Sequence, residues 1–370
     1  MKRLRELGLK IGMWPPGRHN AITDVEGVGV GQVEVAEDGL YTGITAVVPY
    51  PAGVKERQLF VGRWALDGGA GMTGLGVAED FGTFSTPIVL GPAAAVGKIY
   101  DALIQYGLGR DPGLSTVAGW PPIVVGVDDS GWNPPARIYA RVGEPELFQA
   151  LKAVRNGRVN EGNAGIGCGL SAFGFKGGTG TASRVLATGA GTRYTVGVLV
   201  AANAGALEGL CVDRYPVGGR VQPQTADLVG PRTFAAVLAT DAPLVPRQLD
   251  RLSGRAAPGL SRVGLLDGAT REGVVLAFST TGIVQQEEEG GVEEKVRMED
   301  EVVLVEEKVR MEDEAVLHEL FAAAGEACEE AVLNALLAAA PVQKSGRVLG
   351  VLPLGEWVDE VRRYQQEKSR

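Results

Sequence analysis

The stretch YTVGVLVAAN, residues 194–203, is a nearly continuous run of apolar and β-branched residues that ends on a single asparagine. Such a run, bounded by turn residues, is typical of a strand that is buried on both faces. Two more runs of this kind follow along the chain, in RTFAAVLATD (232–241) and GVVLAFSTTG (273–282). The centre of the chain therefore predicts several strands of one buried sheet.

Segments with helical spacing of apolar residues alternate with these strands. They cover residues 93–108 and 244–264, and residues 319–339 predict a strong amphipathic helix that Pro341 closes. Near the start of the chain, β-branched residues and glycine turns in 21–50 predict short strands. Buried strands mixed with helices favour an α/β fold, with layers packed around one core in a single domain.

Histidine is scarce, since only His19 and His318 occur in 370 residues. A Ser-His-Asp triad requires a histidine base, and hydrolytic zinc sites usually require two or three histidine ligands. Neither histidine neighbours a nucleophile or a cluster of ligands in the sequence. If the protein is a hydrolase, we therefore expect its base to be a lysine, a carboxylate or an α-amine.

The net charge of −9 comes from one segment. Residues 287–314 contain 13 of the 45 acidic residues and 4 of the 36 basic ones, so that the rest of the chain is neutral. Within this segment EEKVRMEDE occurs at 293–301 and again at 306–314. Two copies are too few for a solenoid, and the charge opposes burial. We interpret 285–315 as an acidic, repeated insertion that forms a solvated loop or hairpin.

Composition also bounds the location and the partners. The acidic balance makes nucleic acid an unfavourable partner, and no apolar stretch approaches the roughly 20 residues of a membrane span. The N-terminus lacks the apolar core of a signal peptide, and Cys168, Cys211 and Cys328 have no CxxC spacing. These features predict a protein of the reducing cytoplasm.

Taken singly, the candidate site residues have plain structural explanations. Lys176 lies in the glycine-rich KGGTGTASR, which lacks the order of a phosphate-binding loop and is equally typical of a tight turn. Asn203 ends a strand, where asparagine commonly forms turns. Thr233 begins a strand, where β-branched residues are favoured.

Together these motifs resemble a known family over nearly the whole chain. NAITDVEGVGVG (20–31), FKGGTGTASR (175–184), YTVGVLVAAN, ATDAPLVPRQLDRL (239–252) and LAFST (276–280) follow one another in the family's order. The chain resembles the self-processing L-aminopeptidase/D-amino-acid esterase–amidase family, the DmpA/BapA-type β-peptidyl aminopeptidases, and more distantly the nylon-oligomer hydrolases. The resemblance implies a layered αββα sandwich akin to N-terminal-nucleophile hydrolases.

The resemblance also implies a mechanism. The precursor cuts itself between Arg232 and Thr233, which gives chains 1–232 and 233–370. The freed Thr233 then attacks small peptides, amides or esters and forms an acyl-enzyme, with its own α-amine as the base. No metal or organic cofactor is implied, and a homo-oligomer, a tetramer of cleaved protomers, is expected.

Further roles carry over by position. Asn203 matches an asparagine that stabilises the oxyanion, and Lys176 matches a lysine that would hold a carboxylate or lower a neighbouring pKa. Thr270 and Glu272 match two polar residues that assist the nucleophile. The family's glutamate that recognises the substrate amine is replaced here, so that Asp128 or Asp129 in VVGVDDSG takes its place.

Two alternative functions remain open at this level. An acyltransferase of the ornithine acetyltransferase type would use the same threonine and pass the acyl group to an amine. An uncut, non-catalytic member of the family would act as a binding or scaffold protein.

Overall fold

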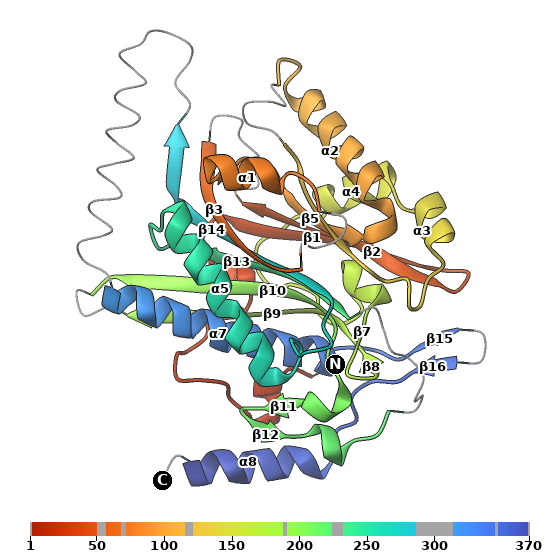
Figure 1. Cartoon of the computed structure of the whole chain (residues 1–370), viewed down its shortest axis with the longest axis vertical. Coiled ribbons are helices and arrows are strands. Elements are labelled where there is room, and N and C mark those ends of the chain that lie inside the picture. Colours follow the sequence, from red (N-terminus) through yellow and green to blue (C-terminus); the bar gives the residue numbers. More distant parts are fainter. Residues whose placement is uncertain are drawn as a thin grey trace.

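The computed structural model describes residues 2–49, 57–67, 72–114, 121–187, 191–223, 232–285, 314–344 and 347–368. Its two principal sheets lie face to face with helices on both outer sides, as Figure 1 shows. The predicted layered αββα sandwich is confirmed. Most of the predicted acidic insertion, residues 286–313, lies outside the described residues, and the prediction of a solvated loop there stays a prediction.

The smaller sheet has four strands in the order β1-β2-β5-β6. β1 and β2 form a hairpin of two ten-residue strands, and β5 pairs with β6 in parallel. Helices α2, α3 and α4 cover its outer face. The bounds are β1 (Val28–Glu37), β2 (Leu40–Pro49), β5 (Ile88–Pro92), β6 (Ile123–Val127), α2 (Val96–Arg110), α3 (Pro135–Arg141) and α4 (Glu144–Lys152).

The larger sheet has six strands in the order β4-β3-β14-β13-β10-β9. Its β13 and β14 pair in parallel and its other neighbours are antiparallel. Helices α5, α7 and α8 contribute to its outer core. The bounds are β3 (Arg57–Leu66), β4 (Thr83–Phe84), β9 (Gly178–Ala187), β10 (Arg193–Asn203), β13 (Thr233–Thr240), β14 (Glu272–Gln285), α1 (Leu75–Phe81), α5 (Pro246–Val263), α7 (Glu314–Leu337) and α8 (Glu356–Lys368).

Short hairpins and 3₁₀ turns connect the longer helices and strands. They are the hairpins β7 (Ser171–Ala172) with β8 (Phe175–Lys176), β11 (Cys211–Val212) with β12 (Tyr215–Pro216), and β15 (Val342–Lys344) with β16 (Arg347–Leu349). The 3₁₀ turns are η1 (Leu4–Leu7), η2 (Ile22–Asp24), η3 (Ala93–Ala95), η4 (Gly165–Gly169), η5 (Leu207–Gly209) and η6 (Gly218–Arg220).

Alternation along the central strands divides the buried residues into separate cores. In β13, Phe234 and Ala236 face the helices of the larger sheet, while Ala235 and Val237 face the smaller sheet. This period of two is what a strand buried on both faces requires. The residues in the core between the sheets are therefore the ones whose side chains point from β13, β10 and β14 toward the other sheet.

The helix predicted at 319–339 is present as α7, but the prediction that it is amphipathic is wrong. Its residues are buried on most sides, including the polar Glu329, Glu330 and Asn334. Small residues let its neighbours come close: a Cβ on Gly180 of β9 would lie 1.9 Å from the Ala331 carbonyl oxygen of α7. A helix that its neighbours cover on most sides has no single apolar stripe, unlike a helix at the surface.

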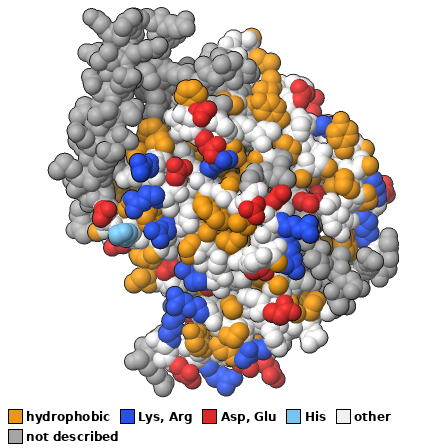
Figure 2. All heavy atoms as spheres, in the orientation of Figure 1, with side chains coloured by type: hydrophobic (Ala, Val, Ile, Leu, Met, Phe, Trp, Pro, Cys, Tyr) orange, Lys and Arg blue, Asp and Glu red, His pale blue; other side chains and the backbone are white. Residues whose placement is uncertain are grey.

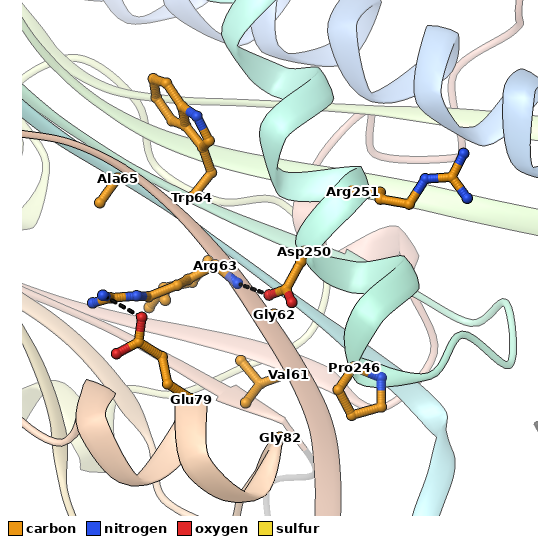
Figure 3. Close-up of a pocket in the computed structure, with 11 residues that line it drawn as sticks. Val61, Gly62, Arg63, Trp64, Ala65, Glu79, Gly82, Pro246, Asp250 and Arg251 are labelled. Atoms are coloured by element: carbon orange, nitrogen blue, oxygen red, sulfur yellow. Dashed lines mark hydrogen bonds and ion pairs between the residues drawn. The ribbon is translucent and has the colours of Figure 1, made fainter. Parts of the chain in front are cut away.

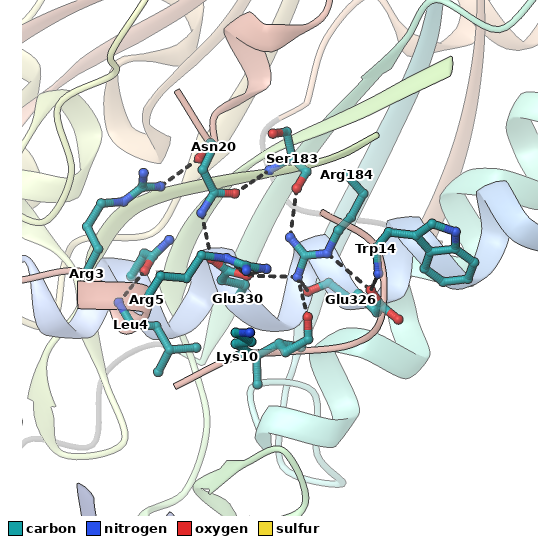
Figure 4. Close-up of polar contacts among 12 residues, drawn as sticks. Arg3, Leu4, Arg5, Lys10, Trp14, Asn20, Ser183, Arg184, Glu326 and Glu330 are labelled. Atoms are coloured by element: carbon teal, nitrogen blue, oxygen red, sulfur yellow. Dashed lines mark hydrogen bonds and ion pairs between the residues drawn. The ribbon is translucent and has the colours of Figure 1, made fainter. Parts of the chain in front are cut away.

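A buried ionic network ties the N-terminal segment to α7 and β9 (Figure 4). Glu330, fully buried, accepts hydrogen bonds from Arg5 at 2.8 and 2.9 Å, from Arg184 at 2.8 Å and from Asn20 at 2.6 Å. Burial alone would raise the pKa of Glu330, but the guanidinium of Arg184, together with Arg5 and Asn20, outweighs burial and lowers it. The carboxylate is therefore charged and fully paired.

We expect Glu330→Gln to lower the free energy of unfolding by about 2–3 kcal/mol, because hydrogen bonds to a charged group contribute about 1.5–3 kcal/mol. The wild-type advantage is present above the ordinary pKa of a glutamate and is lost as the pH falls through the lowered folded pKa. Urea denaturation at several pH values measures both effects. Glu319→Gln, on the exposed side of α7, is the matched control, and equal stability of the two variants would contradict the account.

Both signs of charge are interspersed over the face seen in Figure 2, with apolar side chains between them. Within the described residues, no helix is both long and apolar enough to cross a bilayer.

Candidate active site

Three of the predicted site residues lie side by side on neighbouring strands of the larger sheet. Thr233 begins β13, where it pairs with Asn203, the last residue of β10, and with Glu272, the first residue of β14. Paired residues on adjacent strands project from the same face of a sheet. Since Ala235 faces the smaller sheet, Thr233 does so too. The hydroxyl, the amide and the carboxylate thus share the inner face at one end of the sheet.

The amide of Asn203 is held in one orientation by its neighbours. Its Nδ2 donates to Thr233 Oγ1 at 3.2 Å and to the Asp128 carbonyl oxygen at 2.6 Å. Its Oδ1 accepts from the Ser171 backbone N–H at 3.0 Å. Asn203 is 1% and Thr233 8% exposed. An amide donor is therefore fixed against a buried hydroxyl.

The two aspartates come from the end of β6, in the opposite sheet. Asp128 contributes its carbonyl oxygen to Asn203, while its carboxylate accepts from the Ser130 backbone N–H at 2.9 Å. Asp129 is buried and accepts from Asn133 Nδ2 at 3.0 Å. Burial raises the pKa of Asp129 to about 7. Only Asp128 is thereby brought into the hydrogen-bonded group around Thr233.

Lys176 is linked to the site through the main chain. Its Nζ, fully buried, donates to the carbonyl oxygens of Gly167 at 2.6 Å, Leu170 at 3.0 Å and Gly177 at 3.0 Å. Burial lowers the pKa of Lys176 to about 7. These bonds hold the turn that leads into Ser171, whose N–H fixes Asn203. In the part of the chain that is described, its ammonium thus binds carbonyls, and the predicted contact with a carboxylate is not seen.

Thr270 lies in a polar turn before β14. Its Oγ1 accepts from the Asp267 backbone N–H at 3.0 Å and donates to the Leu265 carbonyl oxygen at 3.2 Å. Asp267, which the sequence analysis did not single out, also accepts from the Ala206 backbone N–H at 3.1 Å and so anchors the segment after Asn203. The Asp-Gly pair in DGATREG was the available signal, since aspartate commonly accepts from nearby backbone groups in turns.

The residue before Thr233 has an unusual backbone conformation. Arg232 has a φ of 51°, in the left-handed region that non-glycine residues adopt at a cost of about 1–2 kcal/mol. Its carbonyl oxygen accepts from the Arg271 backbone N–H at 2.9 Å. This bond extends the pairing of β13 and β14 by one residue beyond Thr233 and Glu272.

A cavity of about 690 Å³ lies along β3, between α1 and α5 (Figure 3). Asp250 of α5 accepts the Arg63 backbone N–H at 2.9 Å, and the Arg63 side chain pairs with Glu79. None of the predicted site residues lines this cavity. The hollow is thus distinct from the group of residues around Thr233.

The raised pKa of Asp129 predicts how stability depends on pH. The folded protein keeps a proton on this carboxyl that the unfolded chain releases above its ordinary pKa of 3.8. Stability should therefore fall as the pH rises from about 4 to about 7, by at most about 4 kcal/mol at about 1.4 kcal/mol for each pKa unit. Asp129→Asn should remove this loss.

Urea denaturation of wild type and Asp129→Asn between pH 4 and 8 measures the difference. We expect the free energy of unfolding of the variant to rise relative to that of the wild type across this range. This difference should level off above about pH 7. Asp101→Asn, on the exposed side of α2, is the control. Parallel curves for wild type and Asp129→Asn would mean that Asp129 is ionised in the folded protein throughout.

The four-layered fold, with Thr233 between its strand partners Asn203 and Glu272 at one end of the larger sheet, defines the class of the protein as an Ntn-like hydrolase. The family profile of peptidase family S58 matches residues 20–349. The chain belongs to peptidase family S58, and the predicted enzyme class, a hydrolase acting on peptide bonds, is confirmed.

Named relatives agree with this assignment. Beta-peptidyl aminopeptidase BapA of Sphingosinicella microcystinivorans is 35% identical, over 91% of this chain and 86% of its own length. The beta-aminopeptidase of a Burkholderia species has a TM-score of 0.82 and 34% identity, over 98% of this chain and 99% of that chain.

The L-aminopeptidase D-Ala-esterase/amidase of Ochrobactrum anthropi has a TM-score of 0.85 and 31% identity, over 99% of each chain. It is described as a prototype of the serine aminopeptidases and a new variant of the Ntn hydrolase fold.

Proposed function

We propose that this protein is a self-processing aminopeptidase that cuts its own chain between Arg232 and Thr233. The freed Thr233 then removes N-terminal residues from small peptides, amides or esters through an acyl-enzyme. The observation that carries this proposal is the hydrogen bond of 3.2 Å between Asn203 Nδ2 and Thr233 Oγ1. Glu272 is the partner of Thr233 on the neighbouring strand, β14.

The base in this mechanism is the α-amine that cleavage exposes on Thr233. A hydroxyl attacks poorly unless a base takes its proton, and an α-amine has an ordinary pKa of about 8. Its position on the nucleophile itself makes a histidine unnecessary. Glu272, in the paired position of β14, would orient the ammonium that forms when the amine accepts the proton.

Asn203 would stabilise the negative charge that develops on the substrate's carbonyl oxygen. Its amide is held by Ser171 and Asp128, so only the N–H that it donates to Thr233 Oγ1 has to pass to the oxyanion as the hydroxyl attacks. Lys176 would support this orientation through the turn before Ser171, and Thr270 through the turn of Asp267. Both would act by positioning rather than by contact with the substrate.

Recognition of the substrate's free amine is assigned to Asp128 or Asp129. Asp128 is favoured by its place beside Asn203, whereas Asp129 is buried and its raised pKa makes it a poorer anion below about pH 7. Two relatives are named beta-peptidyl aminopeptidase and beta-aminopeptidase, and small amides with an N-terminal β- or α-amino acid are the substrate class proposed here.

The assembly is proposed from the family resemblance, and the location from the composition of the chain. We expect a homo-oligomer of cleaved protomers, a tetramer, in the cytoplasm. Exposed apolar side chains such as Met13 and Phe81 provide surface that association would bury. Light scattering of the purified protein tests the tetramer.

A panel of anilides tests the proposed activity. The purified protein should release the aniline from alanyl and β-alanyl anilides, and N-acetylation of either substrate should abolish release, because the free amine would be lost. Turnover that is unchanged by N-acetylation would identify an amidase without amine recognition. Absence of turnover across the panel, in protein shown to be cut, would count against the aminopeptidase assignment.

A further inference from the structure

The peptide bond that self-cleavage breaks has a donor of its own. The oxygen that becomes negative in this step is the Arg232 carbonyl oxygen, which accepts from the Arg271 backbone N–H at 2.9 Å. Asn203 is bound instead to the attacking hydroxyl and to the Asp128 carbonyl. The amide of Asn203, which is the donor proposed for substrate turnover, is thus bound to other groups in the intact chain.

The chemistry of the step defines what this donor would do. Thr233 Oγ attacks the Arg232 carbonyl carbon, and a bond forms between them as the carbonyl electrons move onto the oxygen. The bond from this carbon to the Thr233 nitrogen then breaks, and the proton of the hydroxyl ends on that nitrogen, which becomes the α-amine. Water hydrolyses the resulting ester, frees the Arg232 carboxylate and restores the hydroxyl.

We propose that the Arg271 backbone N–H is the oxyanion donor for self-cleavage, a role separate from that of Asn203 in turnover. This inference rests on the proposed function, since it requires Thr233 to be the internal nucleophile. The N–H lies 2.9 Å from the ground-state carbonyl oxygen and is already aimed at the atom that becomes negative, where a fixed donor stabilises the developing charge. The pairing of β13 with β14 holds both groups in place before the reaction starts.

The backbone conformation of Arg232 is a second feature that favours cleavage of the bond between Arg232 and Thr233. Its left-handed φ of 51° stores strain next to the bond that breaks. Cleavage makes Arg232 a free C-terminus, so the strain is released in the reaction. The strain and the donor therefore both lower the barrier of cleavage and neither is needed for turnover.

Two variants of Arg271 separate its N–H from its side chain. Arg271→Pro removes the N–H, whereas Arg271→Ala keeps it and removes only an exposed side chain. We expect Arg271→Pro to slow the appearance of the fragments about 10²–10³-fold, the loss typical of one oxyanion donor, and Arg271→Ala to cleave at nearly the wild-type rate. The cut fraction of Arg271→Pro should turn over substrate at close to the wild-type kcat.

A second pair of variants tests the strain at Arg232 separately from the Arg271 donor. Arg232→Gly should slow cleavage about five-fold, because glycine adopts the left-handed conformation without strain. Arg214→Gly is the matched control, since Arg214 is an exposed arginine with a φ of 68° in the turn between β11 and β12. It should leave the rate of cleavage unchanged.

Failure of this inference is distinguishable from failure of the proposed function. A folded Arg271→Pro precursor that cleaves at the wild-type rate overturns the inference, provided that Thr233→Ala stays intact. For a proline variant that does not fold, the inference is overturned if Asn203→Ala slows self-cleavage as much as it slows turnover. If Thr233→Ala is itself cut at this bond, the proposed nucleophile is wrong, and the inference is overturned with it.

Discussion

Thr233→Ala is expected to give a folded protein of full length that has no peptidase activity. The hydroxyl of Thr233 would be used twice, first against the Arg232 carbonyl and then against each substrate, so that nothing replaces it in either step. We expect turnover of an aminoacyl anilide to fall by at least about 10⁴-fold, as when the nucleophile of other hydrolases is removed. Gel electrophoresis under denaturing conditions and an anilide assay measure the two losses.

Thr233→Ser is the matched control, because it keeps the hydroxyl and removes only a methyl group. It should cut itself and turn over substrate within about ten-fold of the wild type. Normal turnover by Thr233→Ala would place the active site elsewhere, with Asp128, Asp129 and Glu272 as the next candidates. The family membership would then describe the fold and the class of reaction without the assigned nucleophile.

Asn203→Ala is expected to be slow but active, with kcat/KM about 10²–10³-fold below the wild type. The substitution removes the amide donor that is held against Thr233 Oγ1, but leaves the nucleophile and its α-amine in place. The loss should appear mainly in kcat, because a donor to the oxyanion acts in the transition state. Steady-state kinetics on the same anilide separates kcat from KM.

Asn160→Ala, in an exposed loop, is the control for loss of an asparagine, and should leave both constants unchanged. If Asn203→Ala raised KM with an unchanged kcat, Asn203 would bind the ground state of the substrate instead. Self-cleavage of Asn203→Ala is informative as well. If the Arg271 N–H serves the internal step, cleavage should suffer less than turnover does.

Much of the fold could be predicted from local patterns. The apolar run ending at Asn203 and the strand beginning at Thr233 are strands β10 and β13, and the predicted helix at 244–264 is α5. These elements are buried on one or both faces, so their hydrophobic spacing reports their environment directly. The resemblance to the family supplied what spacing cannot, namely that Asn203 and Thr233 belong to one site.

The remaining features depend on contacts between distant parts of the chain. Burial of α7 on most sides arises because β9, α5 and the N-terminal segment all pack on it, and no local spacing encodes that. The pairing of Glu330 with Arg5 spans 325 residues. The anchor provided by Asp267 likewise becomes visible only when Ala206 is brought beside it.

Within the candidate site, the geometry separates the predicted residues into two groups. Asn203, Thr233 and Glu272 are brought together by strand pairing, and Asp128 joins them through its carbonyl oxygen. Lys176 and Thr270 instead hold the turns next to the strand ends. A glycine-rich loop and a polar turn have the same sequence pattern whether their residues touch Thr233 or only hold the neighbouring backbone. Their position along the chain therefore could not distinguish these two roles.

The most direct test of the central claim is the mass and the N-terminal sequence of the purified wild-type chains. The account predicts two chains, residues 1–232 and 233–370, the smaller of which begins Thr-Phe-Ala-Ala-Val. A small chain with another N-terminus would show that the nucleophile is a different residue. A single chain of 370 residues that hydrolyses aminoacyl anilides would contradict the account, because Thr233 would then have no free α-amine.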